Sequence, residues 1–331
     1  MIFNAYRKTV VSQPKLYHLL YRSQYNKSLN RVAQLALHRI FYSQTADVIE
    51  QLRPDIVVST HFFPSAVVSR LKRSGMDVPL LTVITDYDAH GTWVNTGTNL
   101  YLVSTDNVRD KLIEKGVAPH KIEVTGLPVH PDFWHTYDRA ELIKQLQLAD
   151  MPTVLAMGGG WGIISKFEIL EYVASWRDKV QIIICLGDNE KAREQLEENP
   201  LFRHPNIRLL GFTDQVAQLM EVSDLLITKP GGMTCTEAMA KGIPMLFYDA
   251  IPGQEEKNLH YFISRGYAEK IEGTGTLEKW LNMIVHNRPE YERRRAEISR
   301  KLVAYRPQLC VEKILQYLDD TVANNRSQIN A

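Results

Sequence analysis

Two glycines followed by a threonine and a glutamate form the first candidate site for chemistry in this sequence. Gly231 and Gly232 lie where a helix-like segment begins, and Thr234 and Glu237 follow in its first turns. Glycines let a phosphate group approach the free N–H groups and the positive end of the helix dipole. The pattern therefore predicts a seat for a diphosphate. The spacing of Thr234 and Glu237 also fits a capping box, in which the two side chains satisfy first-turn amides and nothing else happens.

A second polar cluster comes directly behind another glycine turn. Gln254, Glu255 and Asn258 follow Gly253 and supply two amides and a carboxylate. Carboxylates accept hydrogen bonds and amides both donate and accept them, at fixed geometry. This cluster is therefore suited to bracketing several hydroxyl groups of one ligand.

Both clusters are predicted to lie at one edge of a parallel sheet. Residues 224–229 and 245–248 are short apolar runs that predict buried strands, and residues 233–241 between them predict a helix. Gly242 and Pro244 end that helix. One βαβ unit puts both loops at the carboxyl ends of its strands, where open parallel sheets bind ligands.

The same alternation of strands and helices extends along the chain and predicts the α/β class. The other predicted strands are residues 55–60, 80–85, 100–105, 121–125, 153–157, 180–186, 206–210 and 267–271. A last helix is expected at 311–318, and the polar residues after it are expected to fray.

The combined loops resemble a known signature of nucleotide-sugar glycosyltransferases of the two-domain GT-B type. The matching pattern is GG-x-T-x-x-EA, then G-x-P, then PGQEE-x-N. It is most similar to the monogalactosyldiacylglycerol synthases and bacterial diacylglycerol glucosyltransferases, and less so to the N-acetylglucosaminyltransferase that makes lipid II. The resemblance runs from about Arg53 onward. It implies two Rossmann-like doubly wound domains, the first at 1–133 with a helix at 305–325 crossing back to it, and the second at 134–304.

The resemblance also implies which residues hold a UDP-sugar, with no metal or other cofactor. Glu237 would bind the ribose, Thr234 a phosphate, Phe212 and Thr213 the uracil, and Gln254 and Glu255 the sugar hydroxyls. Phe212 is also compatible with a place in the core. The full predicted donor set is Gly159, Gly160, Phe212, Thr213, Gly231, Gly232, Met233, Thr234, Glu237, Gln254, Glu255 and Asn258.

The acceptor side is predicted from polar residues that follow strands of the first domain. Asp86, His90 and Trp93 resemble a family segment that supplies acceptor-site residues, although an Asx turn would explain Asp86 and a core-edge ring would explain Trp93. Relatives carry an earlier Gly-His loop whose histidine is the candidate general base, and no such segment precedes Asp55. The first domain is therefore expected to be incomplete. His90 or Asp86 is the predicted base.

The amino-terminal region concentrates positive charge that the whole-chain balance conceals. With 39 Lys and Arg against 38 Asp and Glu, the net charge of +1 gives no reason to expect nucleic acid as a partner. Residues 1–46 contain no acid, and their basic residues alternate with aromatic ones, which suits an anionic membrane surface. The alternative is an ordinary helix with solvated charges. The predicted membrane contacts are Arg7, Lys8, Lys15 and Arg22.

These observations together predict a cytoplasmic enzyme, peripheral on the membrane, that transfers a hexose from a UDP-sugar to diacylglycerol or a glycolipid. No apolar run reaches the ~20 residues of a spanning helix. The three cysteines are widely spaced and fit buried thiols. Two alternatives stay open: a non-catalytic UDP-sugar-binding protein, and a UDP-N-acetylglucosamine transferase with a polyprenyl-linked acceptor or an epimerase of similar fold.

Overall fold

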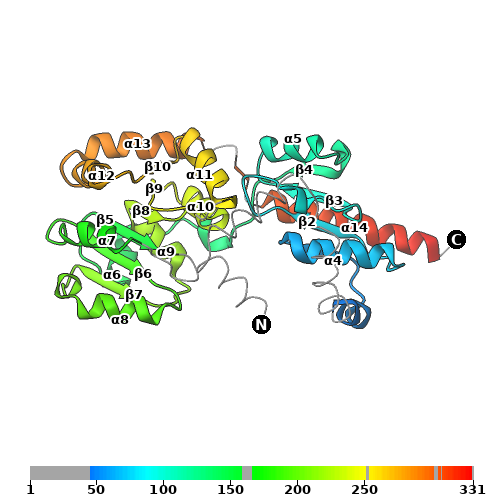
Figure 1. The fold of residues 1–331 in the computed structure, drawn as a ribbon, viewed down its shortest axis with the longest axis horizontal. Coiled ribbons are helices and arrows are strands. Elements are labelled where there is room, and N and C mark those ends of the chain that lie inside the picture. Colours follow the sequence, from blue (N-terminus) through cyan, green and yellow to red (C-terminus); the bar gives the residue numbers. More distant parts are fainter. Residues whose placement is uncertain (1–44, 159–165, 251–252, 302–304, 307, 330–331) are drawn as a thin grey trace. The chain divides into compact units, whose positions relative to one another are not determined.

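The computed structural model describes residues 45–158, 166–250, 253–301, 305–306 and 308–329. They divide into two compact units (Figure 1). Unit 1 contains the described residues up to Pro128, residues 253–254 and those from Arg306 onward, and unit 2 contains the rest. The predicted contacts Arg7, Lys8, Lys15 and Arg22 and the predicted donor residues Gly159 and Gly160 lie outside the described residues.

Unit 1 is built on a four-stranded sheet whose strands follow one another in chain order. Each strand pairs with the next in parallel, so the connections between them must cross over the sheet. The strands are β1 (Val57–Ser59), β2 (Leu80–Val83), β3 (Leu100–Val103) and β4 (Ile122–Val124). The helices are one at residues 45–52, α4 (Phe62–Arg73), α5 (Asp106–Glu114) and α14 (Leu309–Ile329).

Helices cover both faces of this sheet, because successive side chains of a strand point to opposite faces. On one face, Ser65 of α4 hydrogen-bonds Thr82 at 2.8 Å. On the other, Cys310 of α14 is fully buried against Val83 and Leu102. The chain therefore returns to unit 1 at its end.

The last helix is longer than its apolar pattern predicts. The helix expected at 311–318 is present within α14, but the expectation that the polar residues after it fray is wrong, since α14 continues to Ile329. Adding a residue to an existing helix costs far less than starting one, so a segment anchored at Cys310 and Ile314 can extend through polar residues.

Unit 2 contains a six-stranded parallel sheet with the order β10-β9-β8-β5-β6-β7. Its strands are β5 (Thr153–Met157), β6 (Gln181–Cys185), β7 (Ile207–Leu210), β8 (Leu225–Thr228), β9 (Met245–Phe247) and β10 (Ala268–Lys270). The helices around it are α6 (Arg139–Gln145), α7 (Phe167–Ala174), α8 (Glu190–Glu198), α9 (Val216–Val222), α10 (Gly232–Ala240), α11 (Gln254–Ser264), α12 (Thr274–His286) and α13 (Arg288–Lys301).

This order contains a topological switch point between β5 and β8. The chain runs outward from β5 to β7, then returns to place β8 on the other side of β5 and continues to β10. Crossovers on the two sides leave opposite faces of the sheet, so a crevice opens where the direction reverses. The Thr228 hydroxyl donates to the Met157 carbonyl at 3.1 Å and joins the two strand ends there.

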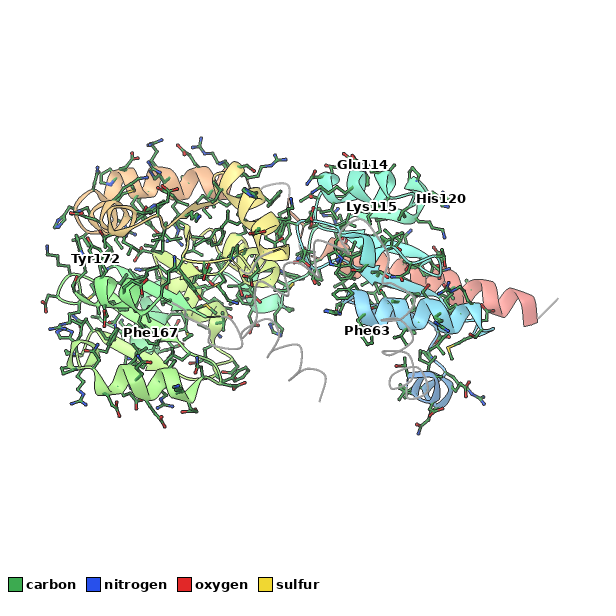
Figure 2. All side chains as sticks on the ribbon, viewed as in Figure 1. Phe63, Glu114, Lys115, His120, Phe167 and Tyr172 are labelled. Atoms are coloured by element: carbon green, nitrogen blue, oxygen red, sulfur yellow. The ribbon has the colours of Figure 1, made fainter. Side chains whose placement is uncertain are left out.

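The core of unit 2 is continuous on both faces of its sheet. Val154, Ile182 and Leu225 point to one face and are no more than 1% exposed. Leu155 and Leu226, which point to the other face, are also fully buried. Phe167 and Tyr172 on α7 pack against the first of these layers (Figure 2). Strands buried on both faces explain the unbroken apolar runs in the sequence.

A buried carboxylate anchors the amino end of β8. Asp224 is fully buried, and its oxygens accept from the Thr153 amide at 2.8 Å and from Arg288 at 2.9 Å. Arg139 lies 3.3 Å away, and Tyr291 donates to the Asp224 carbonyl at 2.8 Å. These bonds fasten α6 and α13 to the edge of the sheet opposite the strand ends that carry the glycine turn.

The described ranges contain no candidate for a membrane-crossing helix. None of the helices there is both long enough and apolar enough to traverse a bilayer.

Candidate functional site

A pocket of about 660 Å³ lies at the carboxyl ends of the strands of unit 2. Met157 ends β5, Cys185 ends β6, and Phe212 follows β7, while Thr234 and Glu237 come from α10. A volume of this size is typical of sites that bury a small organic ligand. Its other lining residues are His130, Asp132, Phe133, Gly187, Gly211, Thr213, Asp214, Gln215, Val216, Ala217 and Gln218.

Phe212 is the exposed aromatic surface of this pocket. Its side chain is 76% exposed, although a phenylalanine is normally among the most buried residues. The alternative that Phe212 belongs to the core is therefore wrong. An exposed ring beside Thr213 offers a flat apolar face on which a planar base can stack.

The glycine turn before α10 leaves the start of that helix open. Gly231 is the N-cap, and no side chain caps the helix, so the capping-box interpretation of Thr234 and Glu237 is wrong. A Cβ at Gly231 would meet no atom within 4 Å, and its backbone φ of −72° does not demand glycine. Gly231 therefore places no side chain before α10, although Gly232 itself is buried and Met233 is half-buried. The dipole of the helix favours an anion at this end.

Glu237 has a carboxyl group that binds its proton more tightly than an exposed glutamate does. Burial raises the pKa of Glu237 to about 7, because the charged form loses hydration. Both Glu237 and Thr234 face the pocket from consecutive turns of α10. A carboxyl group here can accept hydrogen bonds from hydroxyl groups of a ligand.

The lining of the pocket contains acids but neither lysine nor arginine among its described residues. Asp132, Asp214 and Glu237 contribute carboxyl groups, and His130 accepts a hydrogen bond from the Asp132 amide at 3.3 Å. The described lining therefore offers an anion no cationic Lys or Arg side chain, and the part of α10 that reaches it is Thr234 and Glu237.

The second predicted cluster lies beside the glycine turn, at the start of α11. Glu255 pairs with Lys229 at 3.4 Å, and Lys229 is the residue that directly follows β8. Asn258 is fully buried. Gln254 begins α11, and its side chain lies outside the described residues.

The predicted acceptor residues of unit 1 lie in a tightly packed environment. Trp93 is 1% exposed and belongs to a core cluster with Ile84 and Tyr101, which matches the interpretation of it as a core ring. Asp86 is 3% exposed, and its carbonyl accepts from the Ser104 hydroxyl at 2.7 Å.

His90 is buried beside aromatic rings. It is 5% exposed, its Nδ1 hydrogen-bonds the Thr92 hydroxyl, and the Phe62 ring meets it edge-on at 5.2 Å. Burial lowers the pKa of His90 to about 4, so the imidazole is neutral near pH 7. A base with so low a pKa is weak, and the assignment of His90 or Asp86 as general base stays a prediction.

The sequence predicted the pocket residues that lie close to glycines in motifs, but several other lining residues were not predicted. His130, Asp132, Asp214, Gln215, Gln218 and Cys185 were not predicted to line the site. The turn at Gly211, which follows β7, had already predicted Phe212 and Thr213 on this wall, and Gly187 after β6 is the signal that could have located the rest of it. Burial raises the pKa of Cys185 to about 12, so its thiol stays protonated.

The two parallel α/β units define a protein with the GT-B fold. A solved structure of Anabaena HepE in complex with UDP-glucose matches 86% of this chain and 82% of its own, with a TM-score of 0.59 and 15% identity. MurG of Acinetobacter baumannii gives a TM-score of 0.59 at 16% identity over 87% of this chain and 79% of its own. MnaA of S. aureus, solved with UDP, gives 0.61 at 17% identity over 85% and 78%. At these identities the likeness shows the fold.

Sequence comparison then identifies the family. Residues 1–129 match monogalactosyldiacylglycerol (MGDG) synthase, and residues 156–304 match the glycosyltransferase family 28 C-terminal domain. A processive diacylglycerol beta-glucosyltransferase of Bacillus pumilus (strain SAFR-032) is 30% identical over 86% of this chain and 74% of its own length. One of the same name in Bacillus subtilis (strain 168) is 28% identical with the same coverage. The chain belongs to this family of diacylglycerol glycosyltransferases.

Proposed function

We propose that the protein transfers a hexose from a UDP-sugar to diacylglycerol or a glycolipid. Family membership and the printed activity of the two Bacillus relatives support this reaction. The observation that carries the donor half is the pocket that runs from the exposed Phe212 ring to Thr234 and Glu237 on α10. A GT-B neighbour solved with UDP-glucose is consistent with the same class of donor.

Within this proposal, each part of the pocket meets one part of the donor. Uracil stacks on Phe212 and bonds the backbone near Thr213, and the ribose hydroxyls donate to Glu237. Thr234 and the amides of Gly232 and Met233 hold the diphosphate. Glu255, with Gln254 and Asn258, meets the hexose. Gly159 and Gly160, which are outside the described residues, stay proposed donor-binding residues.

The reaction itself needs charge stabilisation on the leaving group. The acceptor oxygen forms a bond to C1 of the hexose as the bond from C1 to the diphosphate oxygen breaks, and the acceptor's proton passes to a base. Negative charge therefore develops on UDP. Helix amides and the α10 dipole aimed at that charge stabilise the transition state more than the ground state.

The acceptor side of the proposal rests on the family alone. His90 or Asp86 serves as base, and Arg7, Lys8, Lys15 and Arg22 bind anionic lipid at the cytoplasmic face of the membrane; Trp93, which lies in the core, supports this side of the site by packing. Each basic residue near such a surface contributes about 1 kcal/mol.

The direct test is UDP release in the presence of vesicles. Vesicles of anionic lipid with and without diacylglycerol are incubated with UDP-glucose, UDP-galactose or UDP-N-acetylglucosamine, and UDP and glycolipid are measured. We expect diacylglycerol-dependent release with one of the hexose donors. Tight UDP binding without any transfer would support the non-catalytic alternative, and transfer only from UDP-N-acetylglucosamine would overturn the hexose assignment.

A further inference from the structure

The ion pair between Lys229 and Glu255 adjoins the glycine turn before α10, and neither residue lines the pocket. Its two side chains are 14% and 15% exposed, and the Lys229 Nζ lies 3.4 Å from a Glu255 carboxylate oxygen. Lys229 directly follows β8 and Glu255 lies in the first turn of α11, which follows β9. The pair therefore joins the ends of two neighbouring strands.

The order of the strands places this pair relative to the donor. The pocket runs along the sheet edge from β7, through β6 and β5, to the helix that follows β8. Those are three strand spacings, or roughly 14 Å, which is about the length of an extended uridine diphosphate. With uracil on Phe212 and the diphosphate at α10, as proposed, the hexose attached to the diphosphate extends toward β9, where Lys229 and Glu255 meet.

The electrostatics of α10 explain why a lysine is needed there. The charges of both Glu255 and Glu237 contribute to a raised pKa of Cys235, behind the desolvation of that thiol, so both carboxyl groups lie close to α10. Two carboxylates near a diphosphate would repel it. Lys229 neutralises the charge of Glu255. It also holds the orientation of the Glu255 carboxylate, because two charged side chains with little access to water are stabilised by staying paired.

We propose that Lys229 is a positioning residue that holds the Glu255 carboxylate against the hexose of the donor, so that the site distinguishes a UDP-sugar from free UDP. This inference rests on the proposed function and deepens it. Carboxylates accept strong hydrogen bonds from sugar hydroxyls, and a fixed carboxylate loses less conformational entropy when it does so. Free UDP has no group at this position and does not benefit.

The test compares the affinities of UDP-glucose and UDP for the full-length protein by calorimetry. In Lys229→Met we expect the preference for UDP-glucose over UDP to fall about tenfold, or about 1.4 kcal/mol. Loss of the positive charge alone would weaken UDP at least as much as UDP-glucose, because free UDP carries the larger negative charge. A changed ratio therefore reports on the sugar. Lys229→Arg, which retains the charge, should keep most of the preference.

Two further variants make the result specific to this pair. Glu255→Gln should lower the ratio as much as Lys229→Met, and the double variant should lower it no further, because the two residues act as one unit. Lys279→Met is the matched control, since Lys279 pairs with Glu269 at 2.9 Å in the same unit but away from the pocket. It should leave the ratio unchanged.

Each outcome has one meaning. An equal loss for both ligands in Lys229→Met, or no loss, would overturn the positioning role while leaving the proposed function intact. Failure of the wild-type protein to bind UDP or UDP-glucose at all would instead overturn the proposed function. Measuring the thermal midpoint of each variant identifies any that fails to fold; if Lys229→Met does, Glu255→Gln carries the comparison, and an unchanged ratio in that variant overturns the proposal.

Discussion

Aromatic and polar residues follow the strands of both units, but they are accessible to solvent in unit 2 and buried in unit 1. In unit 2, Phe212 is 76% exposed and lines a pocket with Glu237 and Thr234. In unit 1, His90 is 5% exposed and Trp93 is 1% exposed, packed against Phe62 and each other. Both groups belong to segments that follow a strand: His90 and Trp93 come after β2, Phe212 after β7, and Thr234 and Glu237 on the helix after β8.

The difference arises from the loops and from the order of the strands. In unit 2, the loops after β6, β7 and β8 contain glycines at 187, 211 and 231, which place no side chain above the sheet edge. The strand order also reverses between β5 and β8, which opens a crevice. In unit 1, the strands follow in simple order, and the loop after β2 folds its own aromatic and charged side chains inward, as in the pair of Asp88 with Lys111. A residue that follows a strand can therefore bind a ligand only if the loops around it leave its side chain accessible.

The largest expected effect tests the buried side of this comparison. Trp93→Ala should lower the free energy of unfolding by about 3–5 kcal/mol, because it removes a large side chain from a packed core. Trp93→Phe should lose much less. Denaturant unfolding followed by circular dichroism measures both. If Trp93→Ala keeps its stability and loses only transfer to lipid, the residue belongs to the acceptor surface and the comparison fails.

The next largest effect is expected in the pocket of unit 2, where a substitution should change ligand affinity and not stability. Glu237→Ala should weaken UDP-glucose binding about tenfold to a hundredfold at pH 8, since hydrogen bonds to a charged group contribute about 1.5–3 kcal/mol. Its free energy of unfolding should not fall, because burial of this carboxyl group is already unfavourable. Calorimetric titration is the measurement. Unchanged affinity with an intact fold would remove Glu237 from the site.

The exposed ring gives the next effect in size. Phe212→Ala should reduce UDP-glucose affinity by about 1–2 kcal/mol, within the range for stacking of a base on an aromatic side chain. Because the ring is 76% exposed, the free energy of unfolding should change by less than about 0.5 kcal/mol. Phe212→Tyr is the matched control and should bind normally. A large loss of stability would show that the ring is part of the core after all.

The last prediction is a pH dependence set by Glu237. Its pKa is raised from 4.5 to about 7, so the folded state holds this proton more tightly than the unfolded state. Its contribution to stability is therefore lost as pH rises from about 4.5 to about 7, and stays constant above that.

Binding should have the opposite sign, because the ionised carboxylate is the better acceptor for ribose hydroxyls. With a pKa of about 7, UDP-glucose affinity should rise about threefold between pH 6.5 and 7.5. UDP-glucose is used because its diphosphate does not titrate in this range. In Glu237→Gln the profile should be flat, and a threefold rise in that variant would assign the titration to another group.

Much of the fold can be predicted from the sequence because parallel strands buried on both faces produce unbroken apolar runs. The runs at 153–157 and 245–248 appear as β5 and β9 with small shifts at their ends. The prediction of two parallel α/β domains of GT-B type is confirmed by the structural neighbours. The residues around the glycine turn were also identified from their types and spacing.

The amino-acid sequence by itself determined the strands, the glycine turn and the family, since these depend on local hydrophobicity and on short motifs. The tertiary structure alone decided which polar side chains are accessible. Phe212 and Trp93 are both aromatic residues in loops after strands, yet one lines a pocket and the other lies in a core. Accessibility depends on strand order and on the packing of distant segments, and the pairing of Lys229 with Glu255 across two strand ends depends on the same long-range contacts.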